Sequence, residues 1–129
     1  MMQDRVILIT GATGALGRAT AYAAAQSGAR LALTARQQQA LDALAAELAL
    51  PADRVLAHAA DLAAADDVRA LIEAIAARWG GVDALLNVAG GWSGGARLAD
   101  LGEADWDAAL EMNLRSAFLI NRAVLPYMA

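Results

Sequence analysis

The chain has 129 residues, of which 59% are hydrophobic and 19% are charged, and this composition predicts one ordered globular domain. The net charge of −4 argues against a nucleic-acid-binding surface, and the absence of cysteine excludes disulfides and thiolate metal sites. No apolar run is long enough to cross a membrane, and the first strand begins too early for a secretory signal, so we expect a cytoplasmic protein by default.

The first predicted element is a short apolar strand at 5–9, of the kind that is buried on both faces. The glycine-rich segment 10–17 follows it, and an alanine-rich helix at 18–27 follows the glycines. A glycine-rich turn between a strand and a helix lets the backbone approach a pyrophosphate closely. The first N–H groups and the positive dipole end of the helix then hold the anion. A tight turn with no ligand is the alternative interpretation.

A second strand and a second helix repeat this order. The strand is predicted at 30–35, and the helix at 38–50 carries its leucines on one face and ends before Pro51. A third strand at 54–59 leads to Asp61.

The remaining residues predict one more helix, one strand and a final helix. The helix at 64–79 has apolar residues at core-facing spacing and ends before Gly80. The fourth strand at 82–88 leads into a flexible glycine-rich loop at 90–95. The last helix begins near Glu103 and continues to the end of the chain, with acidic residues in its first turn where the helix dipole favours them.

Single helices between successive strands predict right-handed crossovers, and therefore an α/β fold with a parallel sheet of four strands in the order 3-2-1-4. This is a Rossmann-like, doubly wound arrangement, and residues 1–129 are interpreted as a single dinucleotide-binding domain. A complete doubly wound domain has two βαβαβ halves, whereas this chain supplies little more than one. We therefore expect a domain that is truncated at its C-terminal end.

Four separated motifs occur in the order and spacing of one family. They are Thr10-Gly11 to Gly17 in the first turn, Asp61-Leu62 after the third strand, Asn87-Val88-Ala89-Gly90 after the fourth strand, and Asp105-Trp106 with Asn113-Leu114 in the last helix. Over essentially its whole length the chain resembles the short-chain dehydrogenase/reductase family. The resemblance implies hydride transfer between a nicotinamide dinucleotide and a small-molecule carbonyl or alcohol substrate.

The resemblance also implies which residues bind the dinucleotide. Asp61 and Leu62 would lie beside the adenine ring, although an aspartate between a strand and a helix is often only a helix cap. No metal site is expected, because His58 is the only histidine. The predicted cofactor-binding residues are Gly11, Thr13, Gly14, Ala15, Leu16, Gly17, Arg36, Asp61, Leu62, Asn87, Ala89 and Gly90.

Two positions depart from the family pattern. The reductase branch usually has glycine where this chain has Ala15, and the spacing of the three glycines is instead that of the extended, epimerase-like branch. The second position of the asparagine motif is Val88, so the hydrogen bonds of a second asparagine are lost. The segment 87–90 nevertheless favours the reductases, because it adds a second site of resemblance.

Asn113 falls on a predicted apolar stripe of the last helix, together with Trp106 and Ile120. An amide that is buried without partners is unfavourable. One interpretation is a side chain that bonds to nearby backbone. The other interpretation, implied by the resemblance, is support of a proton relay next to the family's catalytic lysine.

The family's catalytic serine and Tyr-x-x-x-Lys pair would lie beyond position 129. All ten basic residues are arginine, and neither Tyr22 nor Tyr127 is followed four residues later by lysine. We therefore expect the isolated chain to lack the acid–base step. Two alternatives stay open. One is a non-catalytic nucleotide-binding or interaction module; the other is an S-adenosylmethionine-dependent methyltransferase, which usually has an acidic residue where this second strand ends in Ala35.

The end of the second strand predicts which dinucleotide is preferred. A protein selective for NAD(H) places an acidic residue there to bond the ribose 2′-hydroxyl, whereas this chain has Ala35 followed by Arg36. An arginine instead binds the 2′-phosphate of NADP(H) through paired, charge-assisted hydrogen bonds. We expect NADP(H) over NAD(H); the alternative is that Arg36 only solvates the start of the next helix. Arg18, directly after Gly17, could add positive charge near the pyrophosphate, and no role in choosing between the two dinucleotides is assigned to it.

The surface left by an incomplete sheet predicts self-association. Without further strands beside it, the fourth strand has an apolar edge that pairs readily with another chain. The last helix is expected to expose Leu114, Phe118 and Leu125. We therefore expect a homo-oligomer.

Overall fold

The computed structural model describes residues 2–128. Its elements follow the chain as β1 (Val6–Thr10), α1 (Ala15–Gln26), β2 (Arg30–Leu33), α2 (Gln38–Leu48), β3 (Val55–Ala57), α3 (Ala65–Trp79), β4 (Ala84–Asn87), α4 (Glu103–Leu110) and α5 (Ser116–Val124). Short 3-10 turns lie at 52–54, 98–100 and 125–127, and a π-helical turn at Glu111–Arg115 joins α4 to α5.

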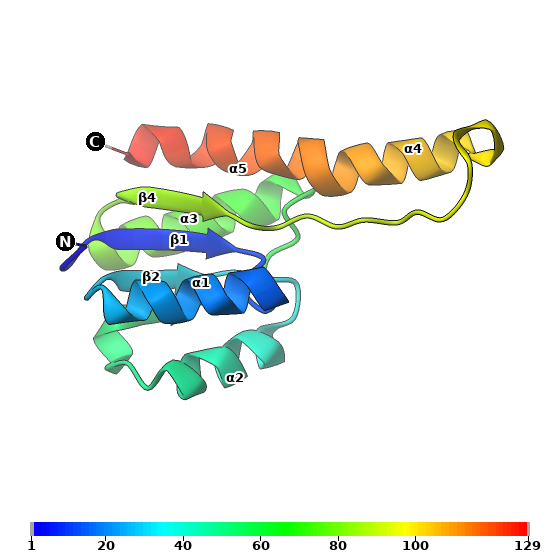
Figure 1. Cartoon of the computed structure of the whole chain (residues 1–129). Helices are drawn as coiled ribbons and strands as arrows, with labels where there is room; N and C mark the ends of the chain where they lie inside the picture. Colours follow the sequence, from blue (N-terminus) through cyan, green and yellow to red (C-terminus); the bar gives the residue numbers. More distant parts are fainter. Residues whose placement is uncertain (1, 129) are drawn as a thin grey trace.

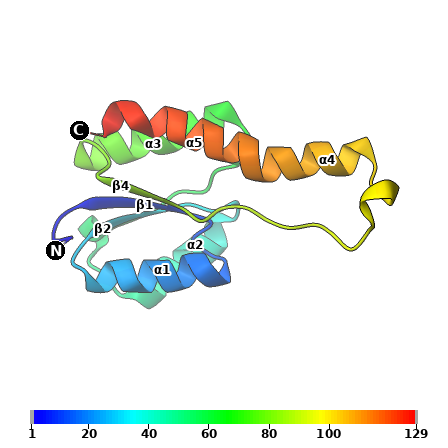
Figure 2. The ribbon, with the colours of Figure 1, turned by 45° about the horizontal axis from the view of Figure 1, so that its top comes forward.

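The four strands form one parallel sheet in the order β3-β2-β1-β4, which confirms the predicted topology. Helices α1 and α2 cover one face of this sheet (Figure 1), and Figure 2 shows α3 and α5 side by side on the opposite face. Because all four strands are parallel, their C-terminal ends meet at one edge of the sheet. That edge is where ligands bind in open α/β sheets.

β2, β3 and β4 are each shorter than the predicted strands, which ran to residues 35, 59 and 88. Beyond the strand ends, single backbone hydrogen bonds continue between neighbouring segments, such as Ala60 N–H to the carbonyl oxygen of Ala35 at 3.0 Å. The first helix begins at Ala15 rather than at residue 18, so its first turn belongs to the glycine-rich segment.

The sheet separates two apolar cores. On one face Leu8 packs with buried residues of α3 and α5, among them Leu71 and Ile120. On the other face Ile9 packs with buried residues of α1 and α2, among them Leu41. All of β1 is buried, because a central strand covered on both faces has no side that faces solvent. Among the helices of residues 2–128, none combines the length and the apolar character that crossing a bilayer requires.

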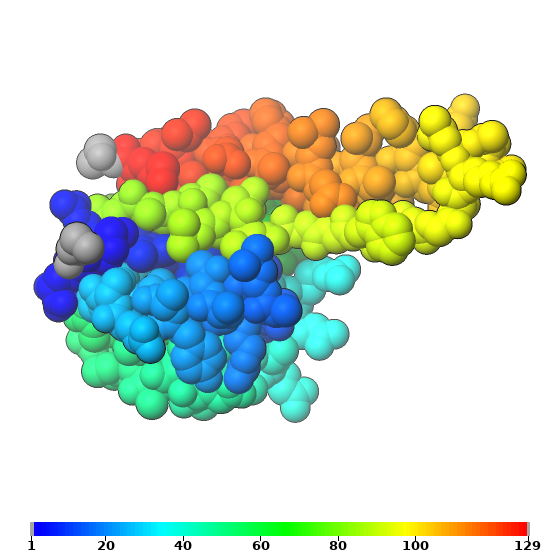
Figure 3. All heavy atoms as spheres, viewed as in Figure 1, coloured from blue at the N-terminus to red at the C-terminus, as the bar shows by residue number. Residues whose placement is uncertain are grey.

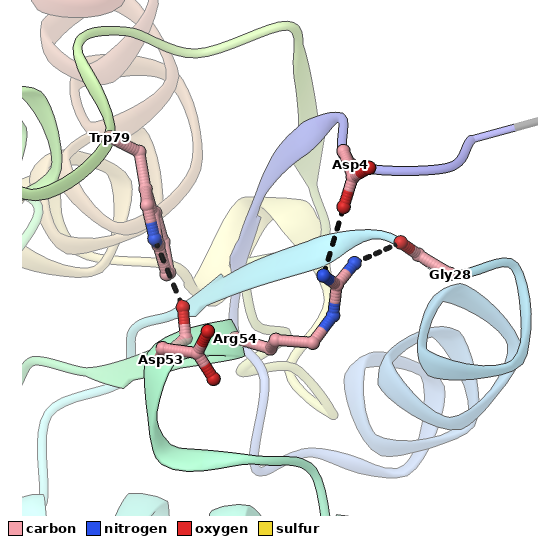
Figure 4. Close-up of polar contacts among 5 residues, drawn as sticks. All are labelled: Asp4, Gly28, Asp53, Arg54 and Trp79. Carbon is pink, nitrogen blue, oxygen red and sulfur yellow. Dashed lines mark hydrogen bonds and ion pairs between the residues drawn. The ribbon is translucent and has the colours of Figure 1, made fainter.

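Polar contacts hold the N-terminal ends of the strands (Figure 4). Arg54, which precedes β3, pairs with Asp4 at 2.9 Å and donates to the carbonyl oxygen of Gly28. The hydrogen bond from Arg54 lowers the pKa of the Asp4 carboxyl. The indole of Trp79 at the end of α3 donates to the carbonyl oxygen of Asp53 at 3.2 Å. These contacts join the segments before β1, β2 and β3 at the end of the sheet opposite the glycine-rich turn.

After β4 the chain leaves the body of the sheet as an extended loop and returns through α4 (Figure 1). We call residues 90–110 the arm. Figure 3 shows the arm in yellow to orange, extending past the blue atoms of α1 and the cyan atoms that follow β2. Its large apolar side chains, including Trp92 and Leu98, are exposed.

Candidate functional site

The glycine-rich turn connects β1 to α1 at the C-terminal edge of the sheet. Gly11 has a φ of 60°, a backbone conformation that favours glycine, and a Cβ atom there would lie 2.8 Å from the backbone of Ala89. A Cβ atom at Gly17 would lie 1.9 Å from the carbonyl oxygen of Gly11. Glycine at both positions therefore lets the turn, α1 and the loop after β4 meet backbone to backbone.

The N-terminus of α1 begins at this turn and has no side-chain cap. Gly14 is the N-cap residue, and no acidic residue lies in the first turn. The N–H groups of Ala15, Leu16 and Gly17 come before Arg18, whose N–H is the first to bond within the helix, to Gly14 at 2.8 Å. These three N–H groups and the helix dipole form the chemical environment that a phosphate group requires.

A cleft of about 740 Å³ opens beside the turn, and this volume lies in the range of cofactor sites. It gathers residues that follow all four strands and one face of the helix from α4 to α5. The predicted residues that line it are Gly11, Thr13, Gly14, Ala15, Leu16, Gly17, Arg36, Asp61, Leu62, Ala89 and Gly90. Two members of the predicted site, Asn87 and Asn113, lie outside the lining.

The segment after β2 forms one wall of the cleft. Ala35, Arg36 and Gln37 line this wall, and Arg36 is exposed. Among the residues that the structure describes, Arg36 pairs with no carboxylate. Its positive charge is therefore not neutralised by a neighbouring acidic side chain.

The contacts of Arg18 do not support the prediction that it adds charge beside a pyrophosphate. Its guanidinium bonds to the carboxylate of Glu47 on α2 and lies 5.4 Å from the centre of the Tyr22 ring. The Tyr22 hydroxyl donates to the same carboxylate at 3.1 Å. The hydrogen bond from Arg18, followed by that from Tyr22, lowers the pKa of Glu47. Arg18 thus joins α1 to α2, because a carboxylate from the neighbouring helix lies within its reach.

Asp61 lines the cleft after β3 but is not the cap of the following helix. The N-cap residue of α3 is Ala64. Asp61 Oδ1 instead accepts the N–H of Ala63 at 3.0 Å, and the N–H of Asp61 donates to the carboxylate of Asp67 at 2.9 Å. These bonds fix the turn that presents Asp61 and Leu62 to the cleft.

Asn87 lies outside the lining of the cleft and bonds to Thr10, the residue that precedes the glycine-rich turn. The hydroxyl of Thr10 donates to the side-chain oxygen of Asn87 at 2.6 Å and accepts the N–H of Ala89 at 3.0 Å. Thr10 is fully buried at the end of β1. One hydroxyl therefore joins the end of β1 to the loop that follows β4.

The last helix contains an irregularity that the sequence analysis did not anticipate. At Glu111–Arg115 the backbone forms a π-helical turn, which is wider than an α-helical turn and rotates the residues after it. The predicted apolar stripe is interrupted: α4 buries none of its residues and its Trp106 is 65% exposed, whereas Ile120 on α5 is fully buried.

Asn113 lies in this π-helical turn and bonds to backbone. Its Oδ1 accepts the N–H of Gly91, and its Nδ2 donates to the carbonyl oxygens of Gly91 and Ala109, each at 3.0 Å. A Cβ atom at Gly90 would lie 2.8 Å from Asn113 Oδ1, so glycine allows this close approach. Of the two interpretations of Asn113, the contacts match the amide bonded to nearby backbone, and they anchor the start of the arm.

The cleft also contains residues that the sequence analysis did not single out. Those on the helix side are Ala108, Glu111, Met112 and Ser116. Three of them, Ala108, Met112 and Ser116, follow one another at intervals of four residues, and this spacing could have indicated a shared helix face. The direction of that face toward the cleft depends on the π-helical turn, which has no sequence signal. Within residues 2–128, no three histidine, aspartate or glutamate side chains are arranged to hold a metal ion.

The parallel sheet, the glycine-rich turn and the cleft at the strand ends define a Rossmann-like α/β protein. A family model described as short chain dehydrogenase matches residues 5–129. The chain belongs to the short-chain dehydrogenase family.

Curated relatives agree with this assignment. The chain is 39% identical over 126 residues to D-threitol dehydrogenase of Mycolicibacterium smegmatis, covering 95% of the chain and 47% of that protein. It is 32% identical over 127 residues to a 3-oxoacyl-acyl-carrier-protein reductase of Thermotoga maritima, covering 98% of the chain and 51% of that protein. The chain therefore spans about half the length of the curated relatives it matches.

Solved structures show the same relationship. A glucose/ribitol dehydrogenase of this family from Brucella melitensis superposes with a TM-score of 0.91 at 34% identity, covering 98% of the chain and 53% of that structure. A variant of actinorhodin polyketide ketoreductase with NADPH superposes with a TM-score of 0.87 at 32% identity, covering 95% of the chain and 46% of that structure.

Proposed function

We propose that this chain is the NADP(H)-binding portion of a short-chain dehydrogenase/reductase that acts on a small carbonyl or alcohol substrate. The observation that carries the proposal is the cleft that joins the uncapped N-terminus of α1 to Arg36. The printed names of the relatives, a dehydrogenase and a reductase, support oxidoreduction. A bound nicotinamide cofactor supplies the hydride chemistry of such enzymes.

The residues of the cleft fit a dinucleotide from end to end. The first N–H groups of α1 would hold the pyrophosphate, because they have no cap and the glycines leave space for a close approach. Asp61 and Leu62 would lie at the adenine, and the segment 88–90 would contact the nicotinamide end. Asn87 and Asn113 would act indirectly, by holding the turn and the arm. Support of a proton relay by Asn113 would require the catalytic groups that this sequence lacks.

The preference for NADP(H) follows from the wall after β2. Arg36 is exposed at the cleft without a carboxylate partner among the described residues, and its neighbour Ala35 cannot bond a ribose 2′-hydroxyl with its side chain. A guanidinium binds a phosphate with two parallel hydrogen bonds. The relative crystallised with NADPH supports the same choice.

Thermal-shift titrations with NADP⁺ and NAD⁺ test this preference. Nucleotide at a hundred times its Kd should stabilise the protein by about 2.7 kcal/mol. Arg36→Ala should weaken NADP⁺ binding by roughly ten- to a hundredfold, since a hydrogen bond to a charged group contributes about 1.5–3 kcal/mol, and should leave NAD⁺ binding unchanged. Ala35→Asp should favour NAD⁺.

Arg69→Ala is the matched control for this experiment, because Arg69 is exposed on α3 and outside the cleft. The control should bind both nucleotides as the wild type does. Equal shifts with NADP⁺ and NAD⁺ in the wild type would contradict the proposed preference. No shift with either nucleotide would contradict the proposed function itself.

A non-catalytic nucleotide-binding or interaction module is the second candidate function. It is favoured by the absence of lysine from the 129 residues, since the family's proton transfer uses a tyrosine next to a lysine. Turnover separates the two candidates: positioned acid–base groups contribute about 10²–10⁴-fold in rate. We expect this isolated chain to bind the cofactor without turnover. Carbonyl reduction at an ordinary enzymatic rate, by protein purified free of host reductases, would rule out the module.

A second copy of this chain is the proposed protein partner. β4 is an outer strand, and the N–H of Asp83 points to β1, so the backbone groups of Ala84 and Leu86 face the open side by alternation. The helix after the arm exposes Leu114 and Phe118, whose exposed fractions are 64% and 56%. The unpaired backbone edge of β4 and the exposed apolar side chains of this helix both support self-association.

A further inference from the structure

β3 is the outer strand on the other side of the sheet, and half of its backbone groups face away from β2. The N–H groups of His58 and Ala60 donate to the segment that contains β2, at 3.0 Å each. Since successive residues of an extended chain alternate in direction, the N–H and C=O groups of Ala57 and Ala59 face the open side. Unpaired groups at such an edge favour pairing with other chains.

The side-chain amide of Gln38 occupies this edge. Its Oε1 accepts the N–H of Ala59 at 2.8 Å, and its Nε2 donates to the carbonyl oxygen of Ala57 at 2.9 Å. The same Nε2 donates to Asp42 one turn further along α2, at 2.9 Å. The amide therefore bonds to β3 as the peptide group of a neighbouring strand would.

Gln38 joins two walls of the cleft although it is not part of the lining. It is the first residue of α2 and directly follows Arg36 and Gln37, which line one wall. Of the two residues that it bonds, Ala59 directly precedes the segment 60–62, which lines the next wall, and Ala57 lies two residues before Ala59. Backbone contact between these walls includes the bond from Ala60 to Ala35, and the Gln38 amide adds two bonds on the opposite side of the segment.

We propose that Gln38 is a positioning residue for the adenosine end of the nucleotide. By holding the start of α2 on the edge of β3, it fixes the placement of Arg36 relative to Asp61 and Leu62. The inference rests on the proposed function and deepens it, because it names what sets the geometry of the adenosine site. Gln38 acts through these residues and not through contact with the ligand.

A positioning role for Gln38 predicts that Gln38→Ala loses affinity for a different set of ligands from Arg36→Ala. Arg36→Ala should affect only ligands with a 2′-phosphate. Gln38→Ala should weaken every adenosine ligand, because both walls lose their fixed separation. It should weaken adenosine 2′,5′-bisphosphate and adenosine 5′-monophosphate by about tenfold, corresponding to the loss of one or two hydrogen bonds. Nicotinamide mononucleotide, which lacks adenosine, should bind as it does to the wild type.

Isothermal titration with these three probes tests the inference on the full chain. Gln38→Glu keeps an acceptor for Ala59 but cannot donate to Ala57, so it should lose affinity as Gln38→Ala does. Gln39→Ala is the matched control, since Gln39 is exposed next to it and outside the cleft. Urea unfolding of each variant distinguishes a local loss of ligand affinity from a loss of overall stability. Amide hydrogen exchange at Ala59, which should become faster in Gln38→Ala, checks the contact without any ligand.

The outcomes distinguish this inference from the proposed function. If the wild type binds the adenosine probes and Gln38→Ala binds them equally well, the positioning role is overturned and the proposed function stands. If Gln38→Ala loses affinity equally for all three probes, or if amide hydrogen exchange at Ala59 is unchanged in this variant, the positioning role is also overturned. If the wild type binds no probe, the proposed function fails and the positioning role fails with it.

Discussion

Asp83, just before β4, joins two strands through one carboxylate. Its Oδ2 accepts the N–H of Val6 at 2.8 Å, and its Oδ1 pairs with Arg5 at 3.0 Å. The backbone hydrogen bond from Val6, followed by the bond from Arg5, lowers the pKa of this carboxyl. The ionised form of Asp83 is therefore favoured in the folded state over the unfolded state.

Replacing Asp83 by asparagine should make stability less dependent on acid pH. A carboxyl whose pKa is lower in the folded state adds stability that is complete above the unfolded pKa, about 3.9, and is lost as the pH falls through the folded pKa. Asp83→Asn should therefore reduce the free energy of unfolding at pH 7 by about 1 kcal/mol and by less at pH 3. Urea unfolding at both values measures this. Asp107→Asn, at an exposed position of α4, is the control, and an equal loss at both pH values would contradict the prediction.

Individual side chains were predictable only where the strand ends determine their position. The sequence places Arg36 and Asp61 directly after strands, and the structure brings both to the cleft. It could not show that Arg18 bonds to Glu47, because that partner lies 29 residues away and belongs to another helix. The contact of Asn87 with Thr10 joins residues 77 positions apart, and no local pattern of the sequence predicts it.

Elements were predictable where apolar periodicity is strong, and their ends were less so. The order of strands and helices and the sheet topology follow from buried runs separated by single helices. β3 extends over only three residues, since the chain after Ala57 is held by single bonds and by the Gln38 side chain instead of a continuous ladder. The π-helical turn at Glu111–Arg115 was not predicted, because no apolar or polar pattern of the sequence marks it.

The packing of α1 on the glycine-rich turn makes a sharp prediction for two glycines. Gly17→Ala should lower the free energy of unfolding by about 1–3 kcal/mol, because its Cβ would lie 1.9 Å from the carbonyl oxygen of Gly11. Gly14→Ala should lower it by less, about 0.5–1 kcal/mol, because the nearest atom is 3.5 Å away and only the preference for glycine over alanine at an N-cap is lost. Denaturant unfolding compares the two variants. Equal stability of both would contradict the close packing of α1.

Gly14→Ala should nevertheless weaken NADP⁺ binding, since Gly14 lines the cleft at the N-terminus of α1. A methyl group there would enter the space in which the backbone approaches the pyrophosphate. The same variant thus separates the structural role of the turn from its proposed binding role. Titration with NADP⁺ measures the second role.

At the scale of the whole molecule, the chain covers about half the length of the two curated relatives described above, and large apolar side chains are exposed on it. Leu114, Phe118 and Leu125 are exposed as the sequence predicts, at 64%, 56% and 62%. They belong to the helix that packs on α3 with its opposite face. An apolar surface of this kind favours association.

We expect this chain to form dimers or larger assemblies at micromolar concentration. Replacing Leu114 and Phe118 together by aspartate should shift the population toward monomer, because association would then bury two charges. Leu98→Asp on the arm is the matched control and should leave the assembly unchanged. Sedimentation velocity measures the masses. A monodisperse wild-type monomer would contradict self-association.

The distribution of the three tryptophans gives the molecule its own optical reporters. Trp92 and Trp106 lie on the arm with exposed fractions of 84% and 65%, and each is two residues away in sequence from a residue that lines the cleft, Gly90 and Ala108 respectively. Trp79 lies at the opposite end of the sheet, bonded to Asp53. The emission of Trp92 and Trp106 should therefore respond to changes in the arm beside the cleft. The emission of Trp79 should respond to loss of the contacts at the N-terminal ends of the strands. Single tryptophan-to-phenylalanine variants would resolve nucleotide binding and unfolding as separate signals in one cuvette.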